Sequence, residues 1–208
     1  MGKNKIIHKL YKILNKFDLS PITKLNYRNG QIIMSKNLKS RYYYSETIEG
    51  KNKDKKITII MFNPAKANID KPDKTINNVY KIIKTYTNYK EFEIFNLFNI
   101  RNSNPSCKKE ADLQTNLKLL EELLNVEKNN NILLAWGNLL YEKYKLNQTE
   151  LELLKHILDK KNLFIVKFTN KKNPIHLSTR NNRYIYPLNS LIQVKISQEI
   201  NFKLIKTQ

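Results

Sequence analysis

The sequence has little cysteine, few glycines and no long apolar run, and each shortage excludes a class of protein. Its single cysteine, Cys107, can form neither an intrachain disulfide nor a cysteine cluster for zinc. No apolar stretch approaches the roughly 20 residues of a membrane-spanning helix. The segment from Met1 to Phe17 alternates lysine with Ile and Leu, without the apolar core or cleavage site of a signal peptide. We therefore expect a cytoplasmic protein with no membrane partner.

Several signatures of catalysis are missing as well. The four glycines form no phosphate-binding loop, and no serine lies in the glycine-flanked elbow of Ser-His-Asp hydrolases. His8, His156 and His176 lack metal-ligand spacing. The sequence therefore predicts no metal and no cofactor.

Acidic residues are scarce compared with basic ones. The chain of 208 residues has 38 Lys and Arg against 18 Asp and Glu, which gives a formal net charge of +20. Such an excess is typical of proteins that bind nucleic acid. However, few of the basic residues are Arg, the residue favoured for bidentate phosphate contacts. Abundant Lys, Asn and Ile also indicate an AT-rich genome, so the charge permits a polyanionic partner without requiring one.

Apolar periodicity predicts an α/β domain. Ile, Leu and Phe at helical spacing predict an amphipathic helix near the N-terminus, solvated or lying on a membrane surface, and two short strands follow at 31–34 and 41–48. Four apolar strands then alternate with helices, at 56–63, 92–98, 131–136 and 163–168. Right-handed crossovers turn such a series into a parallel sheet with helices on both faces.

We therefore predict a three-layer α/β/α fold with a four-stranded parallel sheet, an N-terminal helix and a short β extension. Residues 1–40 form the helix and extension, 41–195 the domain and 196–208 a C-terminal tail.

In an open parallel sheet, ligands bind outside the carboxyl ends of the strands. The residues that follow the four predicted strands are therefore candidates for a site: Phe62, Asn63, Pro64 and Lys66; Asn96 and Arg101; Trp136 and Gly137; Asn173 and His176.

Each candidate also has a plain structural interpretation. Asn63 can hold a water or a base edge, or it can cap a turn before Pro64. Trp136 can be a pocket wall or a core aromatic, and Gly137 can allow a close backbone approach or only a tight turn. His176 lies in an irregular stretch, where it can donate to a developing anion or be exposed.

At these residues the sequence resembles the DUF1643 family, a bacterial and phage family of unassigned function. The motifs occur in the family's order: Arg41-Tyr42, Asn63-Pro64-Ala65-Lys66-Ala67, Asp73-Lys74-Thr75-Ile76, Asn96-Leu97-Phe98 with Arg101 and Pro105, Trp136-Gly137, and Asn173-Pro174-Ile175-His176. The resemblance covers about residues 41–192.

The chain also has a more distant resemblance to uracil-DNA glycosylases, in the Asn63-Pro64 step, the segment from Asn96 to Pro105, the Trp136-Gly137 pair and the loop that follows the fourth strand. This likeness implies a catalytic pair in which Asn63 orients a water and His176 stabilises the departing base. Asn96 would read the base, with Phe62 or Trp136 as a stacking wall. The phosphate contacts would come from basic residues: Lys66, Lys171, Lys172, Arg101, Arg180 and Arg183.

Three functions remain open on the sequence. The first is base-processing chemistry of the glycosylase type on DNA. The second is a non-catalytic module that binds a nucleotide or nucleic acid, which the lack of carboxylates at the strand ends favours. The third is a protein-interaction domain whose charge reflects genome composition alone.

Overall fold

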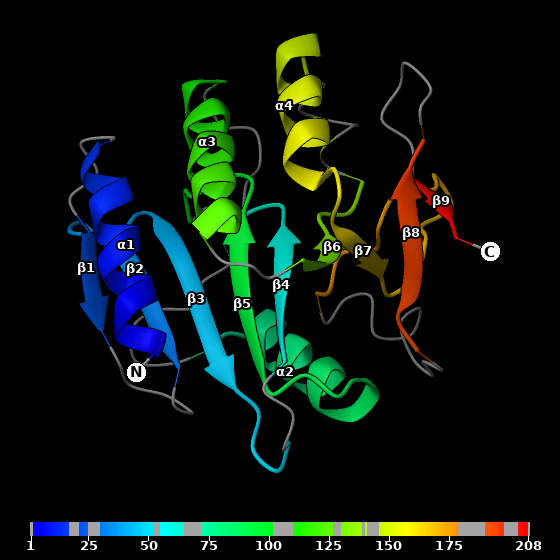
Figure 1. Ribbon diagram of the computed structural model, residues 1–208, viewed down its shortest axis with the longest axis horizontal. Helices are drawn as coiled ribbons and strands as arrows, with labels where there is room; N and C mark the ends of the chain where they lie inside the picture. Colours follow the sequence, from blue (N-terminus) through cyan, green and yellow to red (C-terminus); the bar gives the residue numbers. More distant parts are fainter. Residues whose placement is uncertain are drawn as a thin grey trace.

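The structure is a computed structural model that describes residues 2–16, 21–24, 30–51, 55–64, 72–101, 110–126, 130–138, 140, 146–178, 190–197 and 204–207. Over these residues the chain forms four helices and one mixed sheet (Figure 1). The helices are α1 (Gly2–Lys16), α2 (Lys74–Tyr86), α3 (Glu110–Val126) and α4 (Gln148–Leu158). The strands are β1 (Pro21–Lys24), β2 (Gln31–Ser35), β3 (Arg41–Thr47), β4 (Lys56–Met61), β5 (Glu91–Asn96), β6 (Asn131–Ala135), β7 (Asn162–Ile165), β8 (Ile192–Ile196) and β9 (Leu204–Lys206).

The sheet has nine strands in the order β1-β2-β3-β5-β4-β6-β7-β8-β9. The four inner strands β5, β4, β6 and β7 pair in parallel. The remaining pairings, two at the β7 side and three at the β3 side, are antiparallel. The parallel strands are the four that the apolar runs predicted, and they form the centre of the sheet.

The predicted mixed α/β class is confirmed, and the four predicted strands do pair in parallel, but they are the centre of a nine-stranded sheet in which most pairings are antiparallel, and not a four-stranded sheet. The extension that we predicted beside the domain adds to this sheet, since β3 pairs with β5. The segment predicted as a C-terminal tail contributes β9, which pairs with β8. Both additions extend the two open edges that a four-stranded parallel sheet would leave.

Helices cover both faces of the sheet, with α1, α3 and α4 on one side and α2 on the other (Figure 1). Alternate residues of each strand reach the two cores. In β4, Ile57, Ile59 and Met61 pack on the α2 side, whereas Ile60 packs on the α3 side. Helix α2 forms because Asp73 caps its first turn and its apolar residues recur at helical spacing: Ile76, Val79, Ile82 and Ile83.

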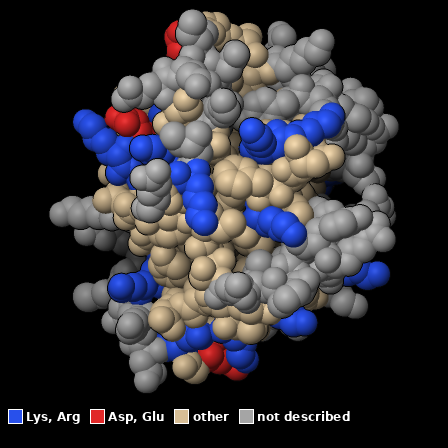
Figure 2. Space-filling view, turned by 90° about the vertical axis from the view of Figure 1, so that its right-hand side faces the viewer, with Lys and Arg blue, Asp and Glu red and all other residues tan. Residues whose placement is uncertain are grey.

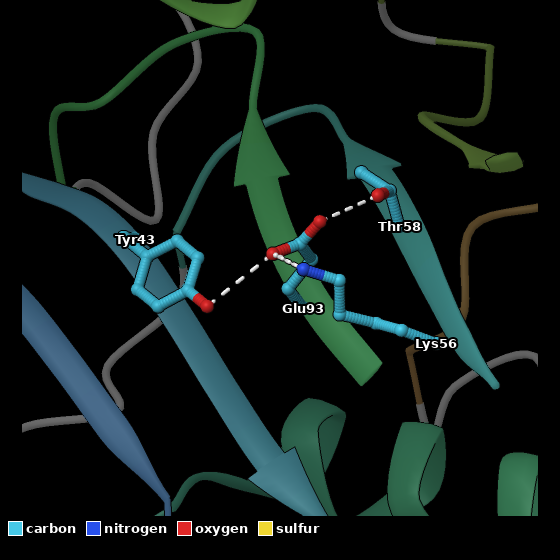
Figure 3. Close-up of polar contacts among 4 residues, drawn as sticks. All are labelled: Tyr43, Lys56, Thr58 and Glu93. Carbon is cyan, nitrogen blue, oxygen red and sulfur yellow. Dashed lines mark hydrogen bonds and ion pairs between the residues drawn. The ribbon is translucent and has the colours of Figure 1, made fainter. Parts of the chain in front are cut away.

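A buried polar cluster ties β3, β5 and β4 together on the α3 side (Figure 3). Glu93 accepts hydrogen bonds from the Thr58 hydroxyl (2.6 Å) and the Tyr43 hydroxyl (3.3 Å). The Lys56 ammonium lies 3.1 Å from the same carboxylate. Burial, and secondarily the Glu93 charge, raises the pKa of Tyr43 well above its usual value, so this phenol stays a neutral donor.

Among the described residues, no helix is long and apolar enough to cross a bilayer.

Candidate functional site

The order of the parallel strands locates the point where the crossovers diverge. The chain passes from β4 to β5 on one side and then to β6 on the other side of β4. Ligands of open α/β sheets bind outside the carboxyl ends of the strands at such a switch point. The register aligns Met61 of β4 with both Asn96 and Ala135, so the three strands end at the same level. The predicted strand-end residues therefore come from one edge of the sheet.

Asn96 is the last residue of β5 and is only 8% exposed. Phe92 and Ile94 pack on the α2 side, and strand alternation places the Asn96 side chain on that side too. Within the part of the chain that the structure describes, neither its Nδ2 nor its Oδ1 has a hydrogen-bond partner. A buried amide without partners costs about 1–3 kcal/mol per unmet group, so the described fold does not by itself account for an asparagine at this position.

Asn63 and Pro64 follow β4 directly, as predicted. Asn63 is partly buried, and its Nδ2 donates to the Pro64 carbonyl oxygen at 3.2 Å. This bond fixes the plane of the amide, and Oδ1 is the atom that can accept from a water. Pro64 is buried and directs the chain out of the sheet.

His176 is brought to the same edge by a contact with β6. The Gly137 amide donates to the Pro174 carbonyl oxygen (3.0 Å), and a Cβ on Gly137 would lie 3.0 Å from the Cβ of His176. The Ser178 amide donates to Nδ1 of His176 at 3.1 Å, so the proton of the neutral imidazole is on Nε2. Burial lowers the pKa of His176 to about 4, against the opposing effect of Asp73. At neutral pH this side chain is an uncharged Nε2–H donor.

The loop that carries His176 is held by a second group of polar contacts. Nδ2 of Asn173 and the hydroxyl of Thr169 both donate to Oδ1 of Asn138, at 3.0 and 2.8 Å. Asn173 thus joins the loop after β7 to the loop after β6. Lys171 and Lys172 are exposed at the turn of this loop, and Lys172 has a φ of 59°.

Helix α2 contributes two further polar side chains next to His176, Asn78 and the cap residue Asp73. Asn78 donates to the Leu177 carbonyl oxygen at 2.9 Å, which fixes the peptide next to His176 against the helix. The Asp73 carboxylate accepts from the Ile76 amide at 2.9 Å and is close enough to influence the pKa of both His176 and Arg41. The sequence placed no carboxylate at the strand ends themselves, and the carboxylate that acts on these two side chains comes from the cap of the helix that follows β4.

Arg41 was quoted in a motif but not predicted as a site residue. It begins β3, is 2% exposed, and its guanidinium carbon lies 5.5 Å from the centre of the Tyr44 ring. Burial lowers the pKa of Arg41 to about 10, Asp73 raises it and Arg101 lowers it further, and the side chain stays charged at neutral pH. Arg101 itself is partly buried, with Nη1 donating to the Leu38 carbonyl oxygen at 2.9 Å.

The two predicted stacking residues lie in the core. Trp136 is fully buried and Phe62 is 1% exposed, and both pack on the α3 side of the sheet. The Phe62 ring lies 5.1 Å from that of Phe98. Because neither ring shows a face at the strand ends, this arrangement favours the structural interpretation of both residues.

Three predicted residues, Lys66, Arg180 and Arg183, lie outside the described residues.

Over the residues that the structure does describe, no three His, Cys, Asp or Glu side chains group as a metal site would require.

The remaining evidence comes from comparison with known proteins. No curated protein and no solved structure matches the chain. The family model of DUF1643, described as a protein of unknown function, matches residues 41–176, which is more than half of the 208 residues. This match begins at Arg41 and ends at His176, so it spans the whole site described above. The chain therefore belongs to the DUF1643 family.

Proposed function

We propose that this protein recognises a nucleobase at the carboxyl edge of β5, β4 and β6 and releases it by hydrolysis of its N-glycosidic bond. The observation that carries the proposal is the Asn96 amide, which is buried and has both its donor and its acceptor unmatched among the described residues. An asparagine amide pairs with a base edge through one donor and one acceptor. A base bound there would satisfy both atoms.

His176 has the properties that a leaving base requires. When the bond between the sugar C1′ and the base nitrogen breaks, the electron pair stays on the base, which becomes an anion. A neutral imidazole with its proton on Nε2 can donate a hydrogen bond to that anion and so stabilise it. A charged imidazole is excluded at neutral pH by the lowered pKa of this side chain.

Asn63 would orient the attacking water. Its Nδ2 is engaged by the Pro64 carbonyl, so Oδ1 is the acceptor for a water proton. The water oxygen then bonds to C1′ and its proton passes to solvent. The resemblance of Asn63-Pro64 and the His176 loop to uracil-DNA glycosylases supports these assignments.

Basic residues would contact the phosphates of a nucleic-acid substrate. Lys171 and Lys172 are exposed on the loop that carries His176. The side of the molecule shown in Figure 2 has scattered Lys and Arg side chains and few acidic ones. Lys195 of β8 and Lys206 of β9 are exposed. Lys66, Arg180 and Arg183 belong to the same proposal. Counterion release by such contacts makes binding steeply salt-dependent.

One observation favours the second candidate, a binding module without chemistry. The Asp73 carboxylate already accepts the Ile76 amide as the cap of α2, so the described site offers no carboxylate dedicated to taking a proton from water. In that case Asn96 and His176 would recognise the base and no bond would break.

The test combines binding with product analysis. Fluorescence anisotropy is measured on single-stranded and duplex DNA, including uracil- and mismatch-containing duplexes, across a salt series, and the products are treated with alkali. Alkali-labile breaks that disappear in Asn63→Ala, but not in the exposed α3 variant Asn125→Ala, support hydrolysis. Binding without breaks supports the module, and its loss in Asn96→Leu supports base recognition.

No binding to any DNA or nucleotide at moderate salt contradicts both functions. Unchanged turnover in Asn63→Ala contradicts the role of that residue alone.

A further inference from the structure

Arg41 is a buried cation, and two of its three guanidinium nitrogens have no acceptor among the described residues. It is 2% exposed, and in the part of the chain that the structure describes its Nε and Nη1 have no hydrogen-bond acceptor. These two nitrogens carry most of the N–H donors of a guanidinium. The Tyr44 ring, 5.5 Å away, offers only its π face. A buried charge is normally hydrogen-bonded as well as paired, so these two nitrogens can take a further acceptor.

Described groups of both charge signs act on Arg41. Arg101 is close enough to lower the pKa of Arg41, whereas Asp73 raises it and is the only carboxylate of the described residues that does so. Asp73 also accepts the Ile76 amide, so part of its acceptor capacity is committed to capping α2. Nε and Nη1 of Arg41 therefore stay available to a further acceptor, such as an incoming anion.

Arg41 also lies next to the proposed base site. Tyr44 pairs with Ile94, so the end of β5 at Asn96 runs beside the beginning of β3. The Arg41 amide donates to the Asn99 carbonyl oxygen at 2.9 Å, which continues this pairing past the strand end. The first turn of α2, whose cap is Asp73, adds the positive end of a 13-residue helix dipole.

We propose that Arg41 binds a phosphoryl group of the ligand, with Arg101 and the first turn of α2 adding positive charge. The inference rests on the proposed function for the base, and it names the ligand class: a nucleotide rather than a free base or nucleoside. Guanidinium matches phosphate oxygens in geometry, and an anion of charge above one suits the two arginines. A mononucleotide and a nucleic-acid terminus share this chemistry.

The first test uses inorganic phosphate alone, so that it does not depend on base recognition. Melting temperatures are measured with phosphate against chloride at equal ionic strength, for wild type, Arg41→Met, Arg41→Lys and Lys56→Met. Lys56 is a matched control, since it is a largely buried cation on the same sheet and is paired with Glu93. Phosphate should stabilise wild type and Lys56→Met, and neither Arg41 variant. Equal stabilisation of Arg41→Met, or none of wild type, overturns the subsite.

The second test compares ligands. A nucleoside 5′-monophosphate should bind wild type about tenfold more tightly or better than its nucleoside, by calorimetry, because a charge-assisted contact is added. In Arg41→Met the two affinities should become equal. A wild-type protein that binds both equally contradicts the proposal.

Oligonucleotides with and without a 5′-phosphate then distinguish the two possible sources of the phosphoryl group, a nucleic-acid terminus and a free mononucleotide. Discrimination between them in wild type, lost in Arg41→Met, assigns the subsite to a nucleic-acid terminus, whereas preference for the monophosphate assigns it to free nucleotides. If phosphate protection depends on Arg41 but no base-containing ligand binds more tightly than phosphate, the base function fails while the anion subsite stands.

Discussion

Gly137 and His176 are in contact across the loops that follow β6 and β7: a Cβ added to Gly137 would meet the Cβ of His176 at 3.0 Å. Gly137 also has a φ of +75°, which side chains rarely adopt. The glycine thus allows the His176 loop to lie directly on the end of β6, and its amide secures the loop by donating to Pro174.

This contact predicts the effect of Gly137→Ala. The variant should be destabilised by about 2–3 kcal/mol, because the positive φ costs about 1–2 kcal/mol and the clash with His176 adds to it. The matched control is Gly50→Ala, where φ is +76° but nothing lies within 4 Å of the new Cβ. Urea unfolding of both variants separates the two terms. Equal losses in the two variants would show that the contact with His176 costs nothing.

We expect the substitution of Asn by Leu to affect stability differently at Asn96 and at Asn116. Both are buried, but Asn116 donates to the Leu97 carbonyl oxygen (3.0 Å) and accepts from Asn99 (3.1 Å), whereas Asn96 has no partner among the described residues. Asn96→Leu should therefore leave stability unchanged or raise it by about 1 kcal/mol, while ligand binding is lost. Asn116→Leu should destabilise by about 1–3 kcal/mol. Chemical denaturation provides both values, and a large loss in Asn96→Leu would assign that amide a structural role.

Two ion pairs of nearly equal length differ in burial, and we expect them to differ in their contribution to stability. Lys56–Glu93 (3.1 Å) has side chains 17% and 2% exposed, whereas Lys16–Glu122 (3.2 Å) has side chains 65% and 37% exposed. Glu93→Ala should cost about 3–5 kcal/mol, because Lys56 loses its counterion and Thr58 and Tyr43 lose their acceptor. Glu122→Ala should cost less than about 0.5 kcal/mol. A double-mutant cycle on each pair measures the coupling, and similar values for the two would contradict this reasoning.

The lowered pKa of His176 predicts a pH dependence of stability. Its value of about 4 in the folded chain lies below the ordinary 6.5, so the unfolded chain takes up the proton first as the pH falls. The free energy of unfolding should therefore be highest above about pH 6.5 and decrease toward pH 4, by up to about 3 kcal/mol from this group.

The measurement compares the free energy of unfolding against pH for wild type and His176→Gln. Carboxylates elsewhere in the chain titrate in the same window, but their contribution is the same in both proteins and cancels in the difference. His156→Gln is the control, because its imidazole is 73% exposed and pairs with Glu121 at the surface. Only His176→Gln should flatten the profile. An unchanged slope in that variant would mean that His176 takes up its proton without cost.

The sequence predicted the centre of the fold because apolar runs of β-branched residues mark buried parallel strands, and it placed Asn63, Asn96 and His176 at one edge because parallel strands end together. It did not predict β8 or β9. Strand β8 alternates exposed Gln193 and Lys195 with buried Val194, too short a pattern to separate from a loop. Strand β8 is specified by the edge of β7 that it covers, and β9 by the edge of β8.

Arg41 and Asp73 could not be assigned from the pattern either. Arginine is almost never fully buried, so a charged residue at the start of a strand indicates a solvated position. Asp73 before an apolar helix indicates a cap, and the structure confirms that role while also placing the carboxylate near Arg41 and His176. What brings these residues together is the crossover between β4 and β5, which has no local signal.

Helix α2 has one more consequence, which concerns ligand length. Its cap residue Asp73 acts on Arg41, and its Asn78, five residues later, holds the peptide beside His176. The helix rises about 1.5 Å per residue, so these two points are about 7.5 Å apart along a rigid axis. One rigid element thus carries both the carboxylate that acts on Arg41 and the amide that holds the His176 loop. If the proposed function is correct, this element would keep the anion end and the base end of the site at a constant separation, and ligands would be selected by the distance between their anionic and heterocyclic groups.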